Sequence, residues 1–202
     1  MATSTLSLAL ASPTEGPVKE STTQPTITIV TGYRPGILAR TLEMHMDFYW
    51  PTEKWGLEFE TGIAKGMANL LSHIDKPGNQ VWSAITTTPA ADPEAPPVER
   101  IVGVVYVNAD YYGKDDMARL QFFIVDESAR GMGVGKKLFA AAMEFLKKSG
   151  IRECHLVTLR KLTAARRLYE GAGFVAGEER SFGKPEDGMK ELPYVWHRPD
   201  GE

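Results

Sequence analysis

The stretch Arg130-Gly131-Met132-Gly133-Val134-Gly135 decides the fold of this chain. An apolar run at residues 120–125 precedes it, and an amphipathic segment that ends at Ser149-Gly150 follows it. This order predicts a strand, a glycine loop and a helix. Glycines let the main chain approach a phosphate closely, and the first helical turn points unpaired N–H groups and a positive dipole end at that phosphate. We therefore expect a phosphorylated small molecule to bind at this loop.

Two common nucleotide-binding motifs do not fit the loop. A P-loop needs glycine at the position of Arg130, and Ser or Thr at the position of Lys137. A dinucleotide-binding fingerprint needs glycine or alanine at Lys136 or at Leu138, depending on the glycine from which it starts. The anchor residues are absent in both cases, so neither nucleotide motif explains the loop.

The loop resembles instead the acetyl-CoA motif of the GNAT superfamily of N-acetyltransferases. That motif has Arg or Gln, then two residues, Gly, one residue, and Gly or Ala, and here Arg130, Gly133 and Gly135 fill the three places. Residues 123–127 resemble the strand end before the motif, and residues 164–174 resemble a second family element downstream. The chain is therefore identified as similar to this superfamily over roughly residues 27–196.

The resemblance is closest to GNAT domains that are often fused to MarR-type regulators. Three segments carry it, at residues 32–36, 55–60 and 118–127. We expect no regulator domain in this chain.

The resemblance implies the GNAT fold, an α/β (α+β) three-layer arrangement. Its central sheet is mixed and mostly antiparallel, with about six to seven strands flanked by about four helices. In that fold the strand before the glycine loop and the strand after the helix splay apart, and the pantetheine arm of acetyl-CoA pairs with the exposed edge. The implied cofactor-binding residues are Phe123, Ile124 and Val125 for the arm, with Arg130, Gly131, Met132, Gly133, Val134, Gly135 and Lys136 for the pyrophosphate.

Acetyl transfer needs a proton donor for the leaving thiolate. Tyr169 stands at the tyrosine of the Leu-Tyr-x-x-x-Gly-Phe element, so the resemblance implies that it is the general acid. Its spacing on the stripe with Ala165, Leu168 and Ala172 also fits a tyrosine of the core.

The reaction also needs a proton acceptor. An alkyl amine with a pKa of about 10.4 is neutral in only about one molecule per thousand near pH 7.4, which costs roughly 4 kcal/mol without a base. Glu60, at the start of the second helix, is the candidate base, and Glu58 is its rival. The helix dipole alone explains a carboxylate at either position, and water relayed from backbone carbonyls is a third option.

The acceptor is expected to be the amine of a small molecule, either a free amine or an amino acid. Many relatives that act on proteins carry Asn seven residues before the helix tyrosine, whereas this chain has Leu162 there. Two alternatives stay open: an acyl-CoA-binding sensor without turnover, and an enzyme that acetylates proteins or peptides. Homodimers are frequent among members of the superfamily, so a homodimer is a further option.

Composition favours one globular domain in the cytoplasm. The chain has 202 residues, 43% of them hydrophobic, and a net charge of −3. We expect a disordered tail at residues 1–25 and one GNAT domain at 26–202. The low charge gives no basic field for nucleic acid or membranes, and no run reaches the about 18 apolar residues of a membrane span. Cys154 is expected to be structural, and the four histidines show no metal-ligand spacing with it.

Apolar periodicity predicts the remaining elements. Pro51 is expected to end the first helix and Thr163 to cap the last one. Four prolines at residues 89–97 predict an exposed hairpin loop. Strands are expected near 27–30, 81–86, 101–107, 119–125, 155–159, 174–180 and 194–197, and helices over 37–50, over 59–74, after the glycine loop and after Thr163.

The apolar pattern also predicts which side chains of the first helix and of the strand at 119–125 lie on the same face. The first helix is expected to turn an apolar stripe inward. The strand at 119–125 is expected to alternate, with Leu120, Phe122 and Ile124 opposite its other side chains. The stripe consists of Leu38, Leu42, His45, Met46 and Tyr49, and the first strand face of Arg119, Gln121, Phe123 and Val125.

Overall fold

A computed structural model of the chain describes residues 26–92, 94–181 and 190–199. The expected tail at 1–25 lies outside the described residues. The described strands form one sheet in the order β1-β2-β3-β4-β5-β8-β6, with β7 paired to β8. The strands are β1 (Thr26–Thr31), β2 (Gln80–Thr88), β3 (Val98–Asn108), β4 (Met117–Val125), β5 (Glu153–Thr158), β6 (Val175–Ala176), β7 (Arg180–Ser181) and β8 (Lys190–His197).

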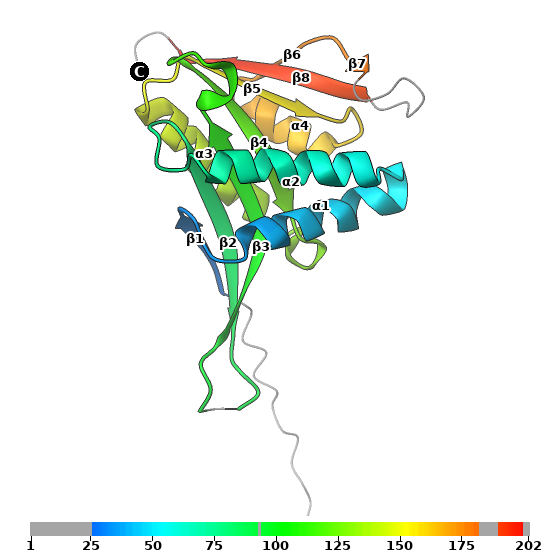
Figure 1. Cartoon of the computed structure of the whole chain (residues 1–202), viewed down its shortest axis with the longest axis vertical. Coiled ribbons are helices and arrows are strands. Elements are labelled where there is room, and N and C mark those ends of the chain that lie inside the picture. Colours follow the sequence, from blue (N-terminus) through cyan, green and yellow to red (C-terminus); the bar gives the residue numbers. More distant parts are fainter. Residues whose placement is uncertain (1–25, 93, 182–189, 200–202) are drawn as a thin grey trace, which may run out of the picture.

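Helices cover both faces of this sheet and make three layers (Figure 1). Helices α1 (Ile37–Glu53) and α2 (Leu57–Leu71) lie on one face, and α3 (Val134–Lys148) and α4 (Thr163–Gly171) lie on the other. Each face has its own buried cluster, one around Tyr106 and Leu70 and one around Leu138 and Leu156. The predicted three-layer, mostly antiparallel architecture is confirmed, with more strands than expected.

The β4–β5 pair is the one parallel pair among the described strands, and it is short. Its register joins Met117 to Glu153, Ala118 to Cys154 and Arg119 to His155, and it stops there. Residues 120–125 of β4 and 156–158 of β5 therefore run on without pairing to each other. The expected splay between these two strands is confirmed.

A β-bulge in β4 lies just beyond the last paired residue. Val104 of β3 pairs with Ile124, while Tyr106 pairs with Gln121, so β4 has one residue more than β3 in this interval. Phe122, within that interval, has a φ of 49°, which is a left-handed conformation that a bulky side chain seldom adopts.

The bulge reverses the alternation of the β4 side chains. Leu120 belongs to the core beneath α3, and Phe123 and Val125 pack against the same core. Ile124 and Phe122 belong to the opposite core beneath α1 and α2. The prediction that Phe123 and Val125 share a face with Arg119 and Gln121 through simple alternation is therefore wrong, because the extra residue shifts the register.

The first helix is longer than predicted, and its inward face is rotated. Pro51 lies inside its last turn, where few backbone bonds remain to be lost, and the N–H of Lys54 still donates to Trp50 at 3.2 Å. Its buried residues are Ile37, Thr41, Met44 and His45, so Leu38, Leu42 and Met46 of the expected stripe lie at its edge.

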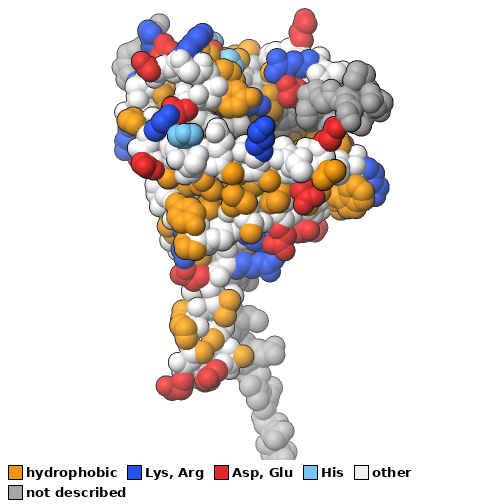
Figure 2. All heavy atoms as spheres, viewed as in Figure 1, with side chains coloured by type: hydrophobic (Ala, Val, Ile, Leu, Met, Phe, Trp, Pro, Cys, Tyr) orange, Lys and Arg blue, Asp and Glu red, His pale blue; other side chains and the backbone are white. Residues whose placement is uncertain are grey.

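The outer surface of the α1–α2 layer carries apolar side chains (Figure 2). At the turn between the helices, Trp50 and Leu57 are 51% and 76% exposed.

Other boundaries differ locally from the predictions. The last helix has Leu162 at its N-cap and no side-chain cap bond, so Thr163 begins the helix instead of capping it. The strand expected at 174–180 is divided into the short β6 and β7, while β8 begins earlier, at Lys190. The β2–β3 hairpin is confirmed, with longer strands than predicted, and it projects from the body of the sheet (Figure 1).

Gly103 of β3 lets α3 lie close to the sheet. A Cβ at this position would lie 3.0 Å from Leu138 Cδ1 and 3.3 Å from Val134 Cγ1. We predict that Gly103→Val lowers the free energy of unfolding by about 1–3 kcal/mol, because overpacking displaces α3. As a control, Gly62→Ala in α2, where a Cβ meets nothing within 4 Å, should raise that free energy by about 0.5–1 kcal/mol. Urea unfolding measures both, and wild-type stability in Gly103→Val would contradict the packing described here.

Candidate functional site

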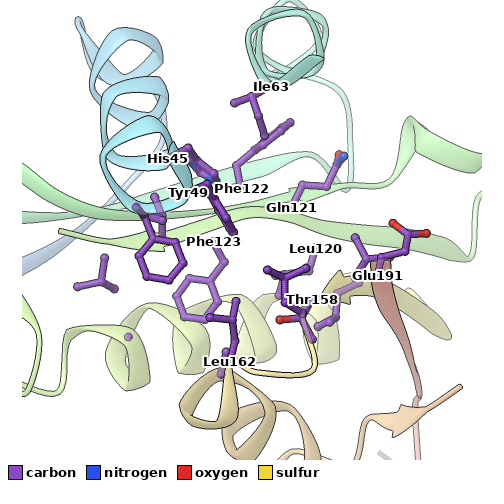
Figure 3. A pocket seen from close by; sticks show the side chains of 18 of the residues that line it. His45, Tyr49, Ile63, Leu120, Gln121, Phe122, Phe123, Thr158, Leu162 and Glu191 are labelled. Carbon is purple, nitrogen blue, oxygen red and sulfur yellow. The ribbon is translucent and has the colours of Figure 1, made fainter. Parts of the chain in front are cut away.

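A cavity of about 700 Å³ occupies the split between β4 and β5. Its walls come from residues 119–125 of β4, from residues 156–159 at the end of β5, and from α1, α2 and α4. Figure 3 shows His45 and Tyr49 on α1 at one side of β4, with Leu162 at the start of α4 at the opposite side. The cavity therefore passes through the plane of the sheet where β4 and β5 are no longer paired.

The glycine loop forms one end of this split. Gly131 and Gly133 have φ values of 78° and 74°, so both need the left-handed conformation that glycine adopts readily. Gly133 is the N-cap of α3 and supplies no side-chain cap bond. The first intrahelical bond runs from the N–H of Lys137 to the carbonyl of Gly133, at 3.1 Å. The N–H groups of residues 134–136 therefore have no acceptor within the helix and can bind an anion.

Asp126 fixes the backbone that leads into this loop through hydrogen bonds and an ion pair. Its N–H donates to the carbonyl of Val102 at 2.8 Å, and its Oδ1 accepts from the N–H of Ser128 at 2.9 Å. Its Oδ2 pairs with Arg40 of α1. Burial works against the charged carboxylate, but the bonds from Ser128 and the charge of Arg40 outweigh it, so the pKa of Asp126 is lowered. This network connects α1, β3 and the glycine loop.

The free edge of β4 presents backbone groups to the split. Asp126 donates to β3, and residues alternate along an antiparallel ladder, so Ile124 also pairs toward β3 and Val125 points its N–H and C=O away from it. The same alternation directs the groups of Phe123 to the open side. An extended ligand can therefore pair with this edge as an added strand does.

The predicted cofactor residues fall into two sets. Phe123, Ile124, Val125, Arg130 and Gly135 line the cavity. Gly131, Met132, Gly133, Val134 and Lys136 do not line it and lie in the loop and first helical turn beside it. The guanidinium of Arg130 stacks on the Phe48 ring at 4.9 Å, which places its charge between α1 and the loop.

Tyr169 of α4 lines the cavity and is only 5% exposed. Its ring packs against Phe139 at 5.4 Å and Tyr194 at 5.8 Å. Burial raises the pKa of Tyr169 far above its usual range, and Tyr49 and Tyr194 add to the effect. The phenol therefore stays protonated near neutral pH, which is the state that a proton donor needs.

The two candidate carboxylates differ in position. Both side chains are exposed, but Glu58 lines the cavity and Glu60 does not. The helix begins at Leu57, and its cavity face carries residues spaced by three and four, including Phe59, Gly62 and Ile63. Glu58 fits that face, while Glu60 lies two residues, or about 200°, around the helix from Glu58.

The cavity includes a histidine that the sequence reasoning did not assign to a site. His45 is buried, and its Nδ1 lies 2.8 Å from the carbonyl of Thr41. Burial lowers the pKa of His45 to about 4, so the ring is neutral at pH 7. A carbonyl only accepts, so Nδ1 carries the proton and Nε2 is left as an acceptor. The helical stripe predicted that His45 faces inward, but only the tertiary structure places it at a cavity.

No group of three or more His, Cys, Asp or Glu side chains among the described residues could hold a metal ion. No helix in the described ranges is both long and apolar enough to cross a membrane.

A model of the acetyltransferase (GNAT) family matches residues 67–174, more than half of the chain. A GNAT-family acetyltransferase from Staphylococcus aureus Mu50 has a similar structure, with a TM-score of 0.60 at 22% identity, covering 85% of this chain and 99% of that one. A chain of the NatC complex bound to Gag peptide and CoA gives 0.62 at 15% identity, covering 86% and 99%. NAA60 of Arabidopsis thaliana in complex with a bisubstrate analogue gives 0.58 at 16% identity, covering 86% and 100%. At these identities the likeness shows the fold. No curated protein matches the chain.

We predict that Asp126→Asn destabilises the protein in a pH-dependent way. The folded-state pKa of Asp126 lies below its unfolded value, so its contribution is present above that unfolded value and is lost as the pH falls through the folded one. The variant should lose about 1–3 kcal/mol at pH 7, and the deficit should shrink below about pH 4. Urea titrations between pH 3 and pH 7 test this, with the exposed Glu144→Gln as control. A deficit that does not vary with pH would contradict the ion-pair network.

Proposed function

Because the chain belongs to the acetyltransferase (GNAT) family, we propose that it transfers the acetyl group of acetyl-CoA to the amine of a small molecule. The family predicted from the two sequence motifs is confirmed by the match over residues 67–174. The observation that carries the proposal is the split between β4 and β5, with the open N-terminus of α3 at one end and a cavity through the sheet. The split provides room for a long thioester and for an acceptor on its other side.

Acetyl-CoA is the cosubstrate. Its pyrophosphate would bind at the N–H groups of residues 134–136, and its pantetheine arm would pair with the free edge at Phe123 and Val125. Arg130 supplies a cation at the junction of the loop with α1. Side-chain identity matters little along the arm, because backbone groups make the contacts, but a Cβ at Gly133 would enter the space of the phosphate.

The chemistry is direct transfer in a ternary complex. The amine nitrogen attacks the thioester carbonyl carbon, the tetrahedral intermediate collapses, and the C–S bond breaks while the sulfur takes a proton. Tyr169 is our candidate donor, because it is protonated, buried and part of the cavity wall. For the acceptor of the amine proton, the position of Glu58 in the wall favours it over Glu60, with water as the alternative.

The shape of the cavity favours a small amine over a protein substrate. Its α1–α2 wall is largely apolar, because the rings of Phe48, Tyr49, Trp55 and Phe59 cover most of it and His45 and Glu58 are its ionisable groups. Leu162, which lines the wall where many protein acetyltransferases carry Asn, supports the same assignment and the kinship with regulator-linked members. A binding module without turnover is the rival function, and a thiol-release assay distinguishes the two.

The cofactor assignment predicts that acetyl-CoA stabilises the protein. At about 100 times its Kd, a ligand adds about 2.7 kcal/mol, which raises the melting temperature by roughly 5 to 10 °C for a chain of this size. Free CoA should act similarly and ATP should not. Absence of a rise with either CoA form would end the proposal.

A matched pair of variants locates that binding. Gly133→Val should abolish the rise in melting temperature with acetyl-CoA, because the valine side chain would occupy the space of the phosphate at the N-terminus of α3. Gly113→Val is the control, since Gly113 also has a left-handed φ, 62°, and lies outside the cavity wall. Both variants carry similar backbone strain, so both should melt lower than the wild type, but only Gly113→Val should keep the response to acetyl-CoA. Equal responses would show that the ligand binds elsewhere.

Tyr169→Phe tests the proposed donor. We expect kcat for any amine that the wild type acetylates to fall by about 10²-fold or more, the usual contribution of a general acid. The melting-temperature rise with acetyl-CoA should persist, because the phenol does not bind the phosphates or the arm. An unchanged kcat would remove Tyr169 from the mechanism and leave the cofactor assignment intact.

A further inference from the structure

A second phenol lines the cavity, from the opposite layer of the fold. Tyr49 is on α1 and Tyr169 is on α4, and the two helices cover opposite faces of the sheet. Figure 3 shows Tyr49 beside His45 and Phe122 on one side of β4, while Leu162, at the start of α4, lies on the other side. The two tyrosines therefore face one cavity across the split between β4 and β5.

The ring of Tyr49 is held in place by its neighbours. It stacks on Trp55 with centroids 5.0 Å apart and planes 13° apart. Phe48 and Phe59 contact it edge-on at 4.8 Å and 5.1 Å. Three rings around one phenol leave it little rotational freedom, so the direction of its hydroxyl is set before any ligand binds.

No hydrogen bond joins the hydroxyl of Tyr49, or that of Tyr169, to another of the residues that the structure describes. Two phenols outside the cavity wall do have partners: the Tyr106 hydroxyl lies 3.1 Å from Thr41 Oγ1, and the Tyr194 hydroxyl donates to Glu170 at 2.7 Å. Buried phenols normally find such a partner. A hydroxyl without one at a cavity wall is available to a ligand.

The Tyr49 hydroxyl can only be a donor near neutral pH. Burial raises the pKa of Tyr49 to about 12, and the negative charge of Glu53 adds to the effect. Burial also raises the pKa of Tyr169, and Tyr49 adds to that effect. Both are therefore protonated, and they face the reaction space from its two sides.

We propose that Tyr49 is a second catalytic residue, whose hydroxyl binds the thioester carbonyl oxygen and stabilises the oxyanion of the tetrahedral intermediate. This inference rests on the acetyl transfer proposed above. When the amine attacks, the C=O electron pair moves to the oxygen, which Tyr49 holds by its O–H without giving up the proton. When the intermediate collapses, the C=O bond re-forms, the C–S bond breaks, and the sulfur takes its proton from Tyr169. The proton lost by nitrogen restores Tyr169 by way of the base or water.

An infrared measurement tests the contact without knowledge of the acceptor. Acetyl-CoA labelled with ¹³C at the acetyl carbonyl is bound to the wild type, to Tyr49→Phe and to the control Tyr106→Phe. A hydrogen bond from Tyr49 weakens the C=O bond, so the labelled stretch should lie lower in the wild type and in Tyr106→Phe than in Tyr49→Phe. The same frequency in all three proteins would overturn the proposal.

Steady-state kinetics test the catalytic role of Tyr49. Tyr49→Phe should lower kcat by about 10²-fold, as loss of one oxyanion donor does, by a similar factor for every amine and with little change in the KM for acetyl-CoA. Tyr106→Phe should keep kcat, because Tyr106 is not in the cavity wall. An effect confined to the KM of the amine would assign Tyr49 to acceptor binding and overturn the proposal. If the wild type does not bind acetyl-CoA, the acetyltransferase function proposed above is wrong.

Discussion

The β-bulge at Phe122 is the constraint on which the site depends. A left-handed conformation at a bulky residue costs about 1–3 kcal/mol, so the surrounding structure must hold it there. Its ring packs edge-on against Tyr106 at 5.4 Å and lies under Gly66 of α2, where a Cβ would come within 2.9 Å of it. The bulge shifts the register of β4 after its short pairing with β5. The bulge lies within the unpaired edge of β4 and beside the cavity, and the open N-terminus of α3 follows a few residues later.

The two helical layers contribute different chemistry to this opening. The α3–α4 layer supplies the free N–H groups at the N-terminus of α3 and the buried phenol of Tyr169. The α1–α2 layer supplies an aromatic wall with Tyr49 and His45. Arg40 and Asp126 connect the layers at the end of β4, so the glycine loop is positioned by α1 as well as by its own strand. The proposed reaction between a thioester and an amine would use this arrangement, with one substrate entering the split from each side of the sheet.

The local features of the site could be predicted from the sequence, whereas the features that depend on packing could not. The loop is predicted by the type and spacing of Gly131, Gly133 and Gly135. The helix of Tyr169 is predicted by the sequence around that residue. The bulge gave no such signal, because Phe122 takes a conformation for which sequence would favour Gly or Asn. Glu60 and Glu58 could both be assigned to the start of the second helix, but the sequence does not show which of the two lines the cavity, because that depends on how α2 packs over β4. Tyr49 and His45 could be assigned to the inward face of α1, but their place at a cavity depends on β4 and α4.

Amide hydrogen exchange at Phe123 and Val125 tests the central claim most directly, namely that the bulge frees an edge of β4 for the cosubstrate. In the free protein these two amides have no strand partner on the open side, so both should exchange quickly, while Ile124, paired to β3, exchanges slowly. Saturating acetyl-CoA should slow Val125 and Phe123 strongly and leave the amides of the β2–β3 hairpin unchanged. If acetyl-CoA binds and both amides keep their fast exchange, the pantetheine arm does not pair with the edge of β4, and the site described here is wrong.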